Sequence, residues 1–149
     1  MPQQPTVIII DDDPLIRLVV SKTLQAVGLD TIEAASGEEG LRLFKEKKAD
    51  AILLDVMMPS GVDGYVTCAA IRSLPEGQHV PILMMTGLED LESINRAYEV
   101  GATDFITKPI NIPLLSHRVR YMLKGSYTTQ QLLQSEQRLH HMAYFDVSH

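Results

Sequence analysis

Short apolar runs alternate along this chain with longer segments in which apolar residues recur at helical spacing. The first run, VIII at residues 7–10, is β-branched and too short for a helix, so it predicts a strand buried on both faces. Similar runs predict strands at residues 31–34, 51–54, 81–85 and 104–107. Five strand–helix units in about 124 residues predict an α/β fold, with a mainly parallel sheet and helices on both of its faces.

The segments between these runs carry signals for the start and the inner face of helices. Three N-cap signals are present: Asp13 before Pro14, Ser36 three residues before Glu39, and Asn111. Further helices are expected through residues 69–74 and 91–98. For the helix that begins at Pro14, apolar spacing predicts a core-facing side made of Leu15, Leu18, Val19 and Val27.

Composition and charge exclude several classes of protein. Apolar residues make up 45% and charged residues 21%, which is typical of a folded globular domain. The net charge of −6 argues against a broad nucleic-acid-binding surface. Cys68 is the single cysteine, so neither an internal disulfide nor a cysteine-based metal site can form. The sequence shows no signal peptide and no apolar stretch near the roughly 18 residues of a membrane span, so we expect a cytoplasmic protein.

Polar residues follow four of the predicted strands. They are Asp11, Asp12 and Asp13 after the first strand, Asp55 after the third, Thr86 after the fourth and Lys108 after the fifth. Parallel strands end at one edge of their sheet, where such folds bind ligands near the switch in strand order. Taken singly, each residue has a simpler interpretation as a loop, turn or helix-cap residue, and for Asp13 the helix cap is the favoured one. Their conjunction predicts a site.

Carboxylates gathered at one edge repel each other, by roughly 4 kcal/mol for two charges about 4 Å apart at an effective dielectric of about 20. The cluster therefore requires a cation, protons or both, and its oxygen ligands favour Mg²⁺ or Mn²⁺ over zinc. With the Lys108 ammonium and the Thr86 hydroxyl nearby, such a site describes an aspartate, Asp55, that accepts a phosphoryl group by attack of its carboxylate.

These residues resemble the receiver domains of two-component response regulators, the CheY-like family. The resemblance rests on VIIIDDDPLIR, ILLDVMMPSGVDG, ILMMTG and GATDFITKPI, and it covers residues 5–123. It implies a flavodoxin-like, doubly wound sheet in the order 2-1-3-4-5 and a receiver domain over residues 5–124. It also implies a sensor histidine kinase or phosphotransfer protein as phosphodonor, a tendency to form homodimers, and a switching rather than an enzymatic role.

The resemblance further implies a role for each site residue. The phosphoacceptor would be Asp55. The metal ligands would be Asp11, Asp12, Asp55 and the backbone carbonyl of Met57. The phosphoryl oxygens would be bound by Thr86 and Lys108, and the switch would pair Thr86 with Phe105. One departure is the loop at residues 58–64, which is one residue longer than the usual M-P-x-M-D-G pattern.

Residues 125–149 differ from the rest and predict a helical linker. Leu132, Leu139 and Met142 recur at steps of seven and three, which favours a helix that packs on a partner. Residues 137–146 resemble the lead-in to GGDEF diguanylate cyclase domains. We therefore expect the N-terminal part of a longer regulator whose output domain makes or degrades cyclic di-GMP, with a plain C-terminal amphipathic helix as the alternative.

Two other functions fit parts of the sequence. A haloacid-dehalogenase-type phosphatase would use Asp11 as nucleophile and Asp13 as acid, although its signature threonine or valine is replaced by Leu15. That family also needs an acidic pair after the lysine, and only Glu136 and Asp146 follow Lys108. The second alternative is an interaction module of the receiver fold that is never phosphorylated, which the complete set of site residues disfavours.

Overall fold

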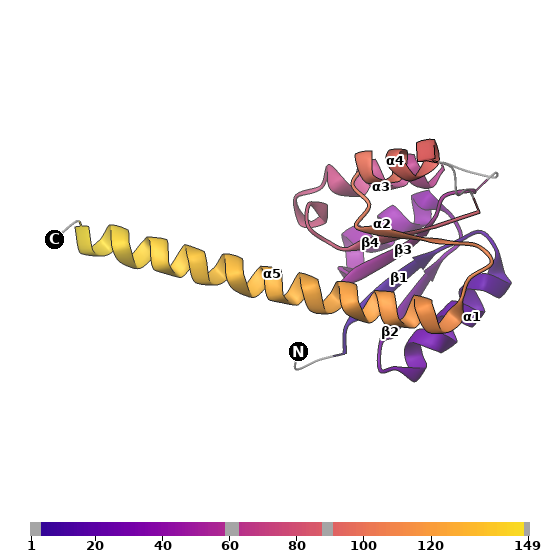
Figure 1. The fold of residues 1–149 in the computed structure, drawn as a ribbon, viewed down its shortest axis with the longest axis horizontal. Coiled ribbons are helices and arrows are strands. Elements are labelled where there is room, and N and C mark those ends of the chain that lie inside the picture. The colour runs from indigo at the N-terminus through magenta and orange to yellow at the C-terminus, as the bar shows by residue number, and fades with distance from the viewer. Residues whose placement is uncertain (1–3, 59–62, 88–90, 148–149) are drawn as a thin grey trace.

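The computed structural model describes the backbone of residues 4–58, 63–87 and 91–147, with side chains as far as Glu136. Within these residues, five strands form one sheet in the order β2-β1-β3-β4-β5 (Figure 1). They are β1 (Thr6–Ile10), β2 (Asp30–Ala34), β3 (Ala51–Asp55), β4 (Ile82–Thr86) and β5 (Asp104–Thr107). Every neighbouring pair is parallel. The predicted fold class and strand order are confirmed.

Helices cover both faces of the sheet. One face carries α1 (Pro14–Ala26) and α5 (Ile112–Val147), and the other carries α2 (Gly37–Lys47), α3 (Gly64–Arg72) and α4 (Leu91–Glu99) (Figure 1). A 3₁₀ turn, η1 (Pro75–Gly77), follows α3, so the helix predicted through residue 74 ends two residues earlier. The layout is the doubly wound architecture that the alternation predicts.

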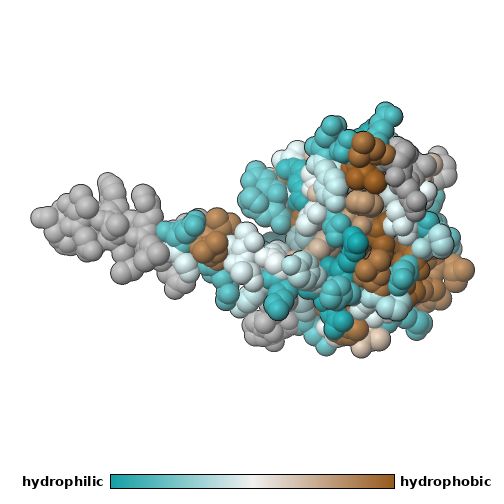
Figure 2. Space-filling view, viewed as in Figure 1, coloured by the Kyte–Doolittle hydropathy of each residue, from teal (hydrophilic) through white to brown (hydrophobic). Residues whose placement is uncertain are grey.

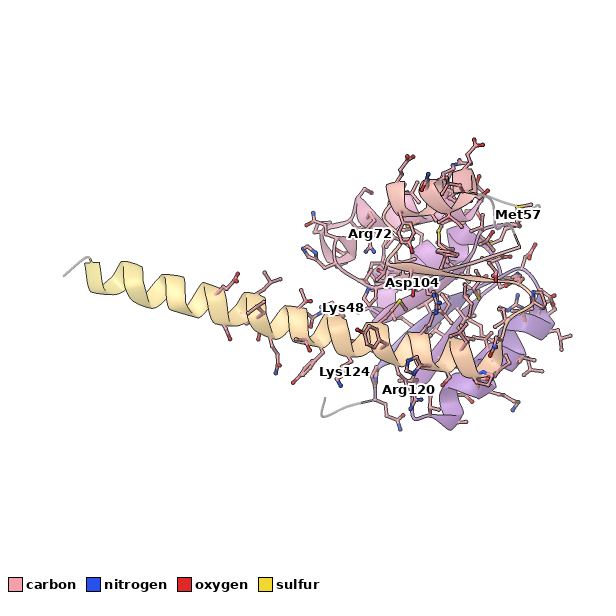
Figure 3. The ribbon with its side chains drawn as sticks, in the orientation of Figure 1. Lys48, Met57, Arg72, Asp104, Arg120 and Lys124 are labelled. Atoms are coloured by element: carbon pink, nitrogen blue, oxygen red, sulfur yellow. The ribbon has the colours of Figure 1, made fainter. Side chains whose placement is uncertain are left out.

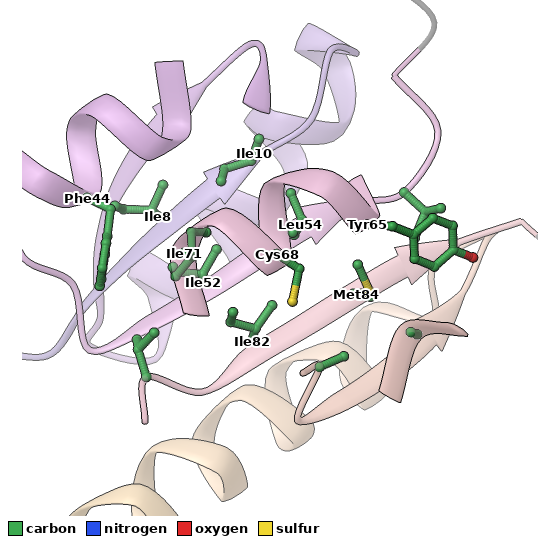
Figure 4. Packing of buried hydrophobic residues seen from close by; sticks show 14 of the residues in the cluster. Ile8, Ile10, Phe44, Ile52, Leu54, Tyr65, Cys68, Ile71, Ile82 and Met84 are labelled. Carbon is green, nitrogen blue, oxygen red and sulfur yellow. The ribbon is translucent and has the colours of Figure 1, made fainter. Parts of the chain in front are cut away.

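Strand residues alternate between two apolar cores. In β1, Ile8 and Ile10 point to the α2–α3–α4 side, whereas Val7 and Ile9 point to the α1–α5 side. Figure 4 shows Phe44, Cys68 and Ile71 packed over the strands on the first side. All four of these β1 side chains are fully buried, as a strand covered on both faces requires.

The predicted inner face of α1 is wrong. Leu15, Leu18, Val19 and Val27 are 65%, 48%, 41% and 38% exposed, whereas Val20 and Leu24 are buried. The helix carries two apolar stripes about 100° apart, and apolar spacing alone does not distinguish them. The direction in which the chain leaves β1 turns the Val20–Leu24 stripe onto the sheet. In α4, too, the apolar residues that share the helical spacing do not all face the core. Ala97 is buried, whereas Leu91 and Tyr98 are 72% and 45% exposed.

All three predicted N-caps are present. The side chains of Asp13, Ser36 and Asn111 accept hydrogen bonds from the backbone N–H groups of Leu15, Glu39 and Leu114, at 2.9, 3.1 and 3.1 Å. These bonds pair N–H groups that the first turn of a helix leaves without a partner. For Asp13, the cap interpretation is therefore the correct one.

The last helix is long and continuous. α5 spans 36 residues, about 54 Å, and passes through Gly125 without interruption, so the predicted boundary between receiver and linker lies inside one helix. Its C-terminal half projects away from the sheet (Figures 1 and 2). Among the described residues, no helix combines the length and apolarity that a membrane crossing needs.

Candidate functional site

The predicted site residues meet at the C-terminal edge of the sheet. Asp11 directly follows β1, Asp55 is the last residue of β3, and Lys108 follows β5. The direction in which strands are added to the sheet reverses between β1 and β3. The chain runs from β1 outward to β2 and then crosses back to place β3 on the other side of β1. This is the switch point at which open α/β sheets bind their ligands.

Lys108 joins two buried carboxylates. Its Nζ lies 3.1 Å from Oδ2 of Asp11 and 3.1 Å from Oδ1 of Asp55. The side chains of these aspartates are 0% and 2% exposed, whereas that of Lys108 is 24% exposed. Two buried negative charges thus share one positive charge that still reaches solvent, which leaves the site with an uncompensated negative charge when both aspartates are ionised.

Three carboxylates fit a divalent cation. Asp11, Asp12 and Asp55 each place one oxygen so that all three lie within 4.8 Å of one another. A hard cation such as Mg²⁺ takes oxygen ligands of this kind and would neutralise the remaining charge. Met57, predicted to add a backbone carbonyl, lies two residues after Asp55 and donates its N–H to Oδ1 of Asp55 at 3.3 Å. Met57 lies at the edge of the molecule, far from Lys124 (Figure 3).

The electrostatics of the site shift two pKa values. Burial, and after it the charge of Asp11, raise the pKa of Asp55 to about 6, although Lys108 and the Met57 N–H act in the opposite direction. Burial alone would lower the pKa of Lys108, but the attraction of Asp55 and Asp11 outweighs it and raises that pKa. Near neutral pH, Asp55 is therefore mostly ionised and Lys108 is protonated.

The predicted switch residues lie on the two strands beyond β3. Thr86 ends β4, is buried, and accepts the backbone N–H of Lys108 on its carbonyl at 2.7 Å. Phe105 in β5 is half-buried, and its ring meets that of Tyr98 edge-on, with centroids 5.9 Å apart. The backbone of Thr86 is thus linked directly to Lys108, while the ring of Phe105 packs against α4.

The start of α3 is held against the end of β3. Asp63 caps α3 by accepting the Val66 N–H at 2.9 Å, and a Cβ on Gly64 would lie 2.3 Å from the carbonyl oxygen of Asp55. Glycine is therefore required for this close approach. The extra residue predicted in the loop 58–64 concerns residues 59–62, which lie outside the described residues.

The contacts that support Asp11 were not predicted from the sequence. Arg17 donates from its guanidinium to the backbone carbonyl of Asp11 at 2.7 Å and pairs with Glu33 of β2 at 3.3 Å. The N–H of Asp13 donates to the carboxylate of Asp11 at 2.9 Å. The signal available in the sequence was the position of Arg17, one turn after the cap residue Asp13, from which a long side chain reaches back to the strand end.

Comparisons with known proteins agree with this geometry. The model of the response regulator receiver domain matches residues 7–120. The transcriptional regulatory protein AfsQ1 of Streptomyces coelicolor is 37% identical over 120 residues, which are 80% of this chain and 52% of that protein. The DNA-binding dual master transcriptional regulator RpaA of Synechocystis is 36% identical over 120 residues, or 80% of this chain and 49% of that protein. The chain thus spans about half the length of these curated relatives.

Among solved structures, the chemotaxis response regulator CheY4 of Vibrio cholerae superposes with a TM-score of 0.76 at 33% identity. The match covers 80% of this chain and 98% of the CheY4 chain. The two curated relatives are named as transcriptional regulators, which gives the predicted cyclase output no support. The fold, the cluster at the strand ends and these matches lead to one conclusion: the chain belongs to the response regulator receiver family.

Proposed function

We propose that Asp55 accepts a phosphoryl group from a phosphohistidine on a sensor histidine kinase or phosphotransfer protein. The observation that carries this proposal is the pairing of a buried Asp55 with Lys108 inside a cluster of three carboxylates. We expect this phosphoryl transfer to take place in the cytoplasm, because its reducing conditions suit a chain with a single cysteine.

In this reaction, an oxygen of Asp55 forms a bond to phosphorus while the phosphorus–nitrogen bond of the donor breaks and its electron pair returns to the imidazole. Lys108 starts in contact with Asp55, so its ammonium needs only a small movement to pair with a phosphoryl oxygen. A bound divalent cation would supply charge shielding for the incoming group. Thr86 ends the adjacent strand β4, and we propose that its hydroxyl bonds a phosphoryl oxygen.

Phosphorylation would then act as a switch. It adds roughly −1.5 to −2 charges and three acceptor oxygens to the end of β3. We propose that Thr86 moves toward the phosphoryl group and that Phe105 turns into the space it leaves, which changes the surface formed by α4, β5 and α5. The size of this shift is limited by the free-energy difference between the two states.

The test uses a small acyl phosphate as donor, with Mg²⁺ present, and intact-mass measurement of the product. We expect the wild-type chain to gain one phosphoryl group and Asp55→Asn to gain none. Asp63→Asn is the matched control, because asparagine also caps helices well and the carboxylate of Asp63 caps α3 and is not one of the three clustered carboxylates. A wild-type protein that takes up no label would favour the unphosphorylated interaction module. Equal labelling of Asp55→Asn would defeat the assignment of Asp55.

The phosphatase alternative is disfavoured by the position of Asp13. In that mechanism Asp13 would be the acid, but it is exposed and its carboxylate is engaged in capping α1. We therefore propose a domain that accepts one phosphoryl group and releases it slowly, without turnover of other substrates. Incubation with a generic phosphate ester is expected to give no more than one equivalent of product. Sustained release of alcohol, abolished by Asp11→Asn, would instead show a phosphatase.

For the output, we propose a further domain in the same polypeptide. A DNA-binding output is supported by the name of the Synechocystis relative, and the Streptomyces relative is named as a transcriptional regulatory protein. A diguanylate cyclase output rests only on residues 137–146, which resemble the lead-in to GGDEF domains. The full-length gene product distinguishes the two: conversion of GTP to cyclic di-GMP indicates the cyclase, and retardation of promoter DNA indicates the transcription factor.

A further inference from the structure

A groove lies between α5 and the N-terminal edge of the sheet, at the opposite end of the strands from Asp55. Beyond the core residue Met122, α5 continues past this edge, and a groove of about 640 Å³ separates it from the segments that lead into β3 and β4. Figure 2 shows a hollow where the projecting part of α5 leaves the receiver. None of the predicted phosphorylation, metal or switch residues lines this groove.

The groove, here called the edge groove, is long and is lined from three parts of the fold. Its lining includes Tyr121 and Leu133 at the two ends of the α5 wall, Val80 and Pro81 just before β4, and Asp50 and Glu76 in the segments before β3 and β4. From the first to the last lining residue of α5, the helix rises about 18 Å, which matches five or six residues of extended chain. A short peptide segment therefore fits the length of the groove.

Arg72 holds the segment before β4 in place beside the groove. Its guanidinium donates to the backbone carbonyls of Gly77 and Val80 at 2.9 and 2.6 Å, and to that of Gly101 at 2.9 Å. These bonds join α3 to the segment before β4 and to the turn before β5. The side of the groove that this segment forms is therefore already fixed in the folded chain, and a partner would not have to order it on binding.

Gly125 lies in the α5 wall of the groove, at a position where the chain itself does not require a glycine. The residue is inside a continuous helix of 36 residues, and a Cβ built on it would meet no atom within 4 Å. Glycine destabilises the interior of a helix relative to alanine. A partner that approaches the backbone of α5 closely would explain why no side chain is present here.

The charged groups of the lining favour a basic partner. Among the described residues, Asp50 and Glu76 form no salt bridge. No described lysine or arginine lines the groove, since Lys48 and Lys124 adjoin lining residues in the sequence but are not part of the lining. Carboxylates form strong hydrogen bonds with arginine and lysine side chains. A nucleotide or another anion would instead find His79 as its one potentially cationic contact among the described residues.

Apolar side chains line the groove together with these carboxylates. Leu133 is 42% exposed, and Val80 lines the groove from the segment before β4. An extended segment points alternate side chains to opposite sides, so basic residues that alternate with apolar ones would meet both kinds of lining. We propose that the edge groove binds an extended segment of a partner protein, about six residues long. Its basic side chains pair with Asp50 and Glu76, and its apolar side chains pack on Leu133 and Val80.

The first experiment measures binding of a fluorescein-labelled hexapeptide of alternating arginine and leucine to the chain 1–149 by fluorescence anisotropy. We expect a dissociation constant below about 100 µM, and at least about tenfold weaker binding when serine replaces leucine or glutamate replaces arginine. Asp55→Asn should bind the peptide as the wild type does, because this inference does not depend on phosphorylation. No binding at about 1 mM protein, or equal binding of the serine peptide, would overturn the proposal.

The second experiment tests the carboxylates with two double variants that remove the same charge. Asp50→Asn with Glu76→Gln should weaken binding of the arginine–leucine peptide at least about tenfold. Glu46→Gln with Glu92→Gln is the matched control, because both residues are exposed and neither lines the groove, and it should leave binding unchanged. Thermal melts establish that each protein is folded. Equal weakening in both double variants would show attraction to the net charge of −6 instead of to the groove.

The third experiment tests the α5 wall. Leu133→Ser should weaken peptide binding several-fold, whereas Leu132→Ser should not, because Leu132 is 58% exposed and does not line the edge groove. Gly125→Leu places a side chain in the open space of the groove, so it should abolish binding without lowering the melting temperature. Equal binding by the two serine variants, or full binding by Gly125→Leu, would overturn the assignment of this groove as the binding site.

Discussion

The fold buries the carboxylate of Asp55, and this burial lowers the stability of the folded state when the carboxylate is ionised. Its pKa is about 6 in the folded protein against an ordinary value of 3.8, so the folded state binds the proton more tightly than the unfolded state. The stabilising contribution is complete below pH 4 and is lost as the pH rises through 6. About two pKa units at roughly 1.4 kcal/mol each correspond to about 3 kcal/mol.

We therefore predict that, in the presence of a chelator, Asp55→Asn is more stable than the wild type at pH 8 by up to about 3 kcal/mol, and that this advantage disappears near pH 4. Urea denaturation of both proteins at a series of pH values measures the difference. Saturating Mg²⁺ should reduce the advantage, because the ion binds the ionised carboxylate of the wild type. An advantage that does not change with pH would contradict the raised pKa.

Arg17 is predicted to support the metal site without contacting the ion. It holds the carbonyl of Asp11 at 2.7 Å and is anchored by Glu33. Residues that orient metal ligands typically change metal affinity by about 10–100-fold when they are replaced. Arg17→Gln should therefore weaken Mg²⁺ binding by at least about tenfold in calorimetric titration. Glu33→Gln, which keeps an acceptor for Arg17, should have a smaller effect; equal affinities in all three proteins would show no support from Arg17.

At the scale of elements, the approach of α3 to β3 makes Gly64 a sensitive position. A Cβ there would lie 2.3 Å from the carbonyl oxygen of Asp55 and 2.8 Å from Cα of Val56, so Gly64→Ala must move α3 away from the site. We predict destabilisation by about 1–3 kcal/mol together with weaker Mg²⁺ binding. Gly87→Ala is the control, because its Cβ would meet no atom within 4 Å. Denaturant melts and metal titration of both variants provide the comparison.

The elements themselves could be predicted because their signals are local. β-Branched runs identify the strands, and Asp13, Ser36 and Asn111 mark helix starts by hydrogen bonds within one turn. The inner face of α1 could not be predicted, since the choice between its Val19 and Val20 stripes depends on packing against the sheet. For the same reason, Asp55 and Lys108 were found from their positions at strand ends, whereas the contact from Arg17 to the carbonyl of Asp11 depends on where a long side chain reaches in space.

At the scale of the whole molecule, the receiver should fold without the C-terminal half of α5. The residues of α5 that fill the core all precede Lys124: they are Leu115, Val119, Met122 and Leu123. We predict that a chain ending at Tyr127 binds Mg²⁺ as the full chain does and unfolds in one cooperative transition. Calorimetry and metal titration test this prediction. Loss of either property would mean that residues beyond 127 belong to the receiver and that the predicted boundary at 124 is misplaced.

The continuity of α5 has a mechanical consequence. A helix without a break resists torsion. A small rotation of its first turns, which pack beside α1, would therefore reappear as a rotation of the far end of α5 instead of being absorbed by a hinge. The angle between the receiver and the far end of α5 is thus set by the number of residues between them, at about 100° for each residue. A segment joined rigidly to the end of α5 would turn through the same angle.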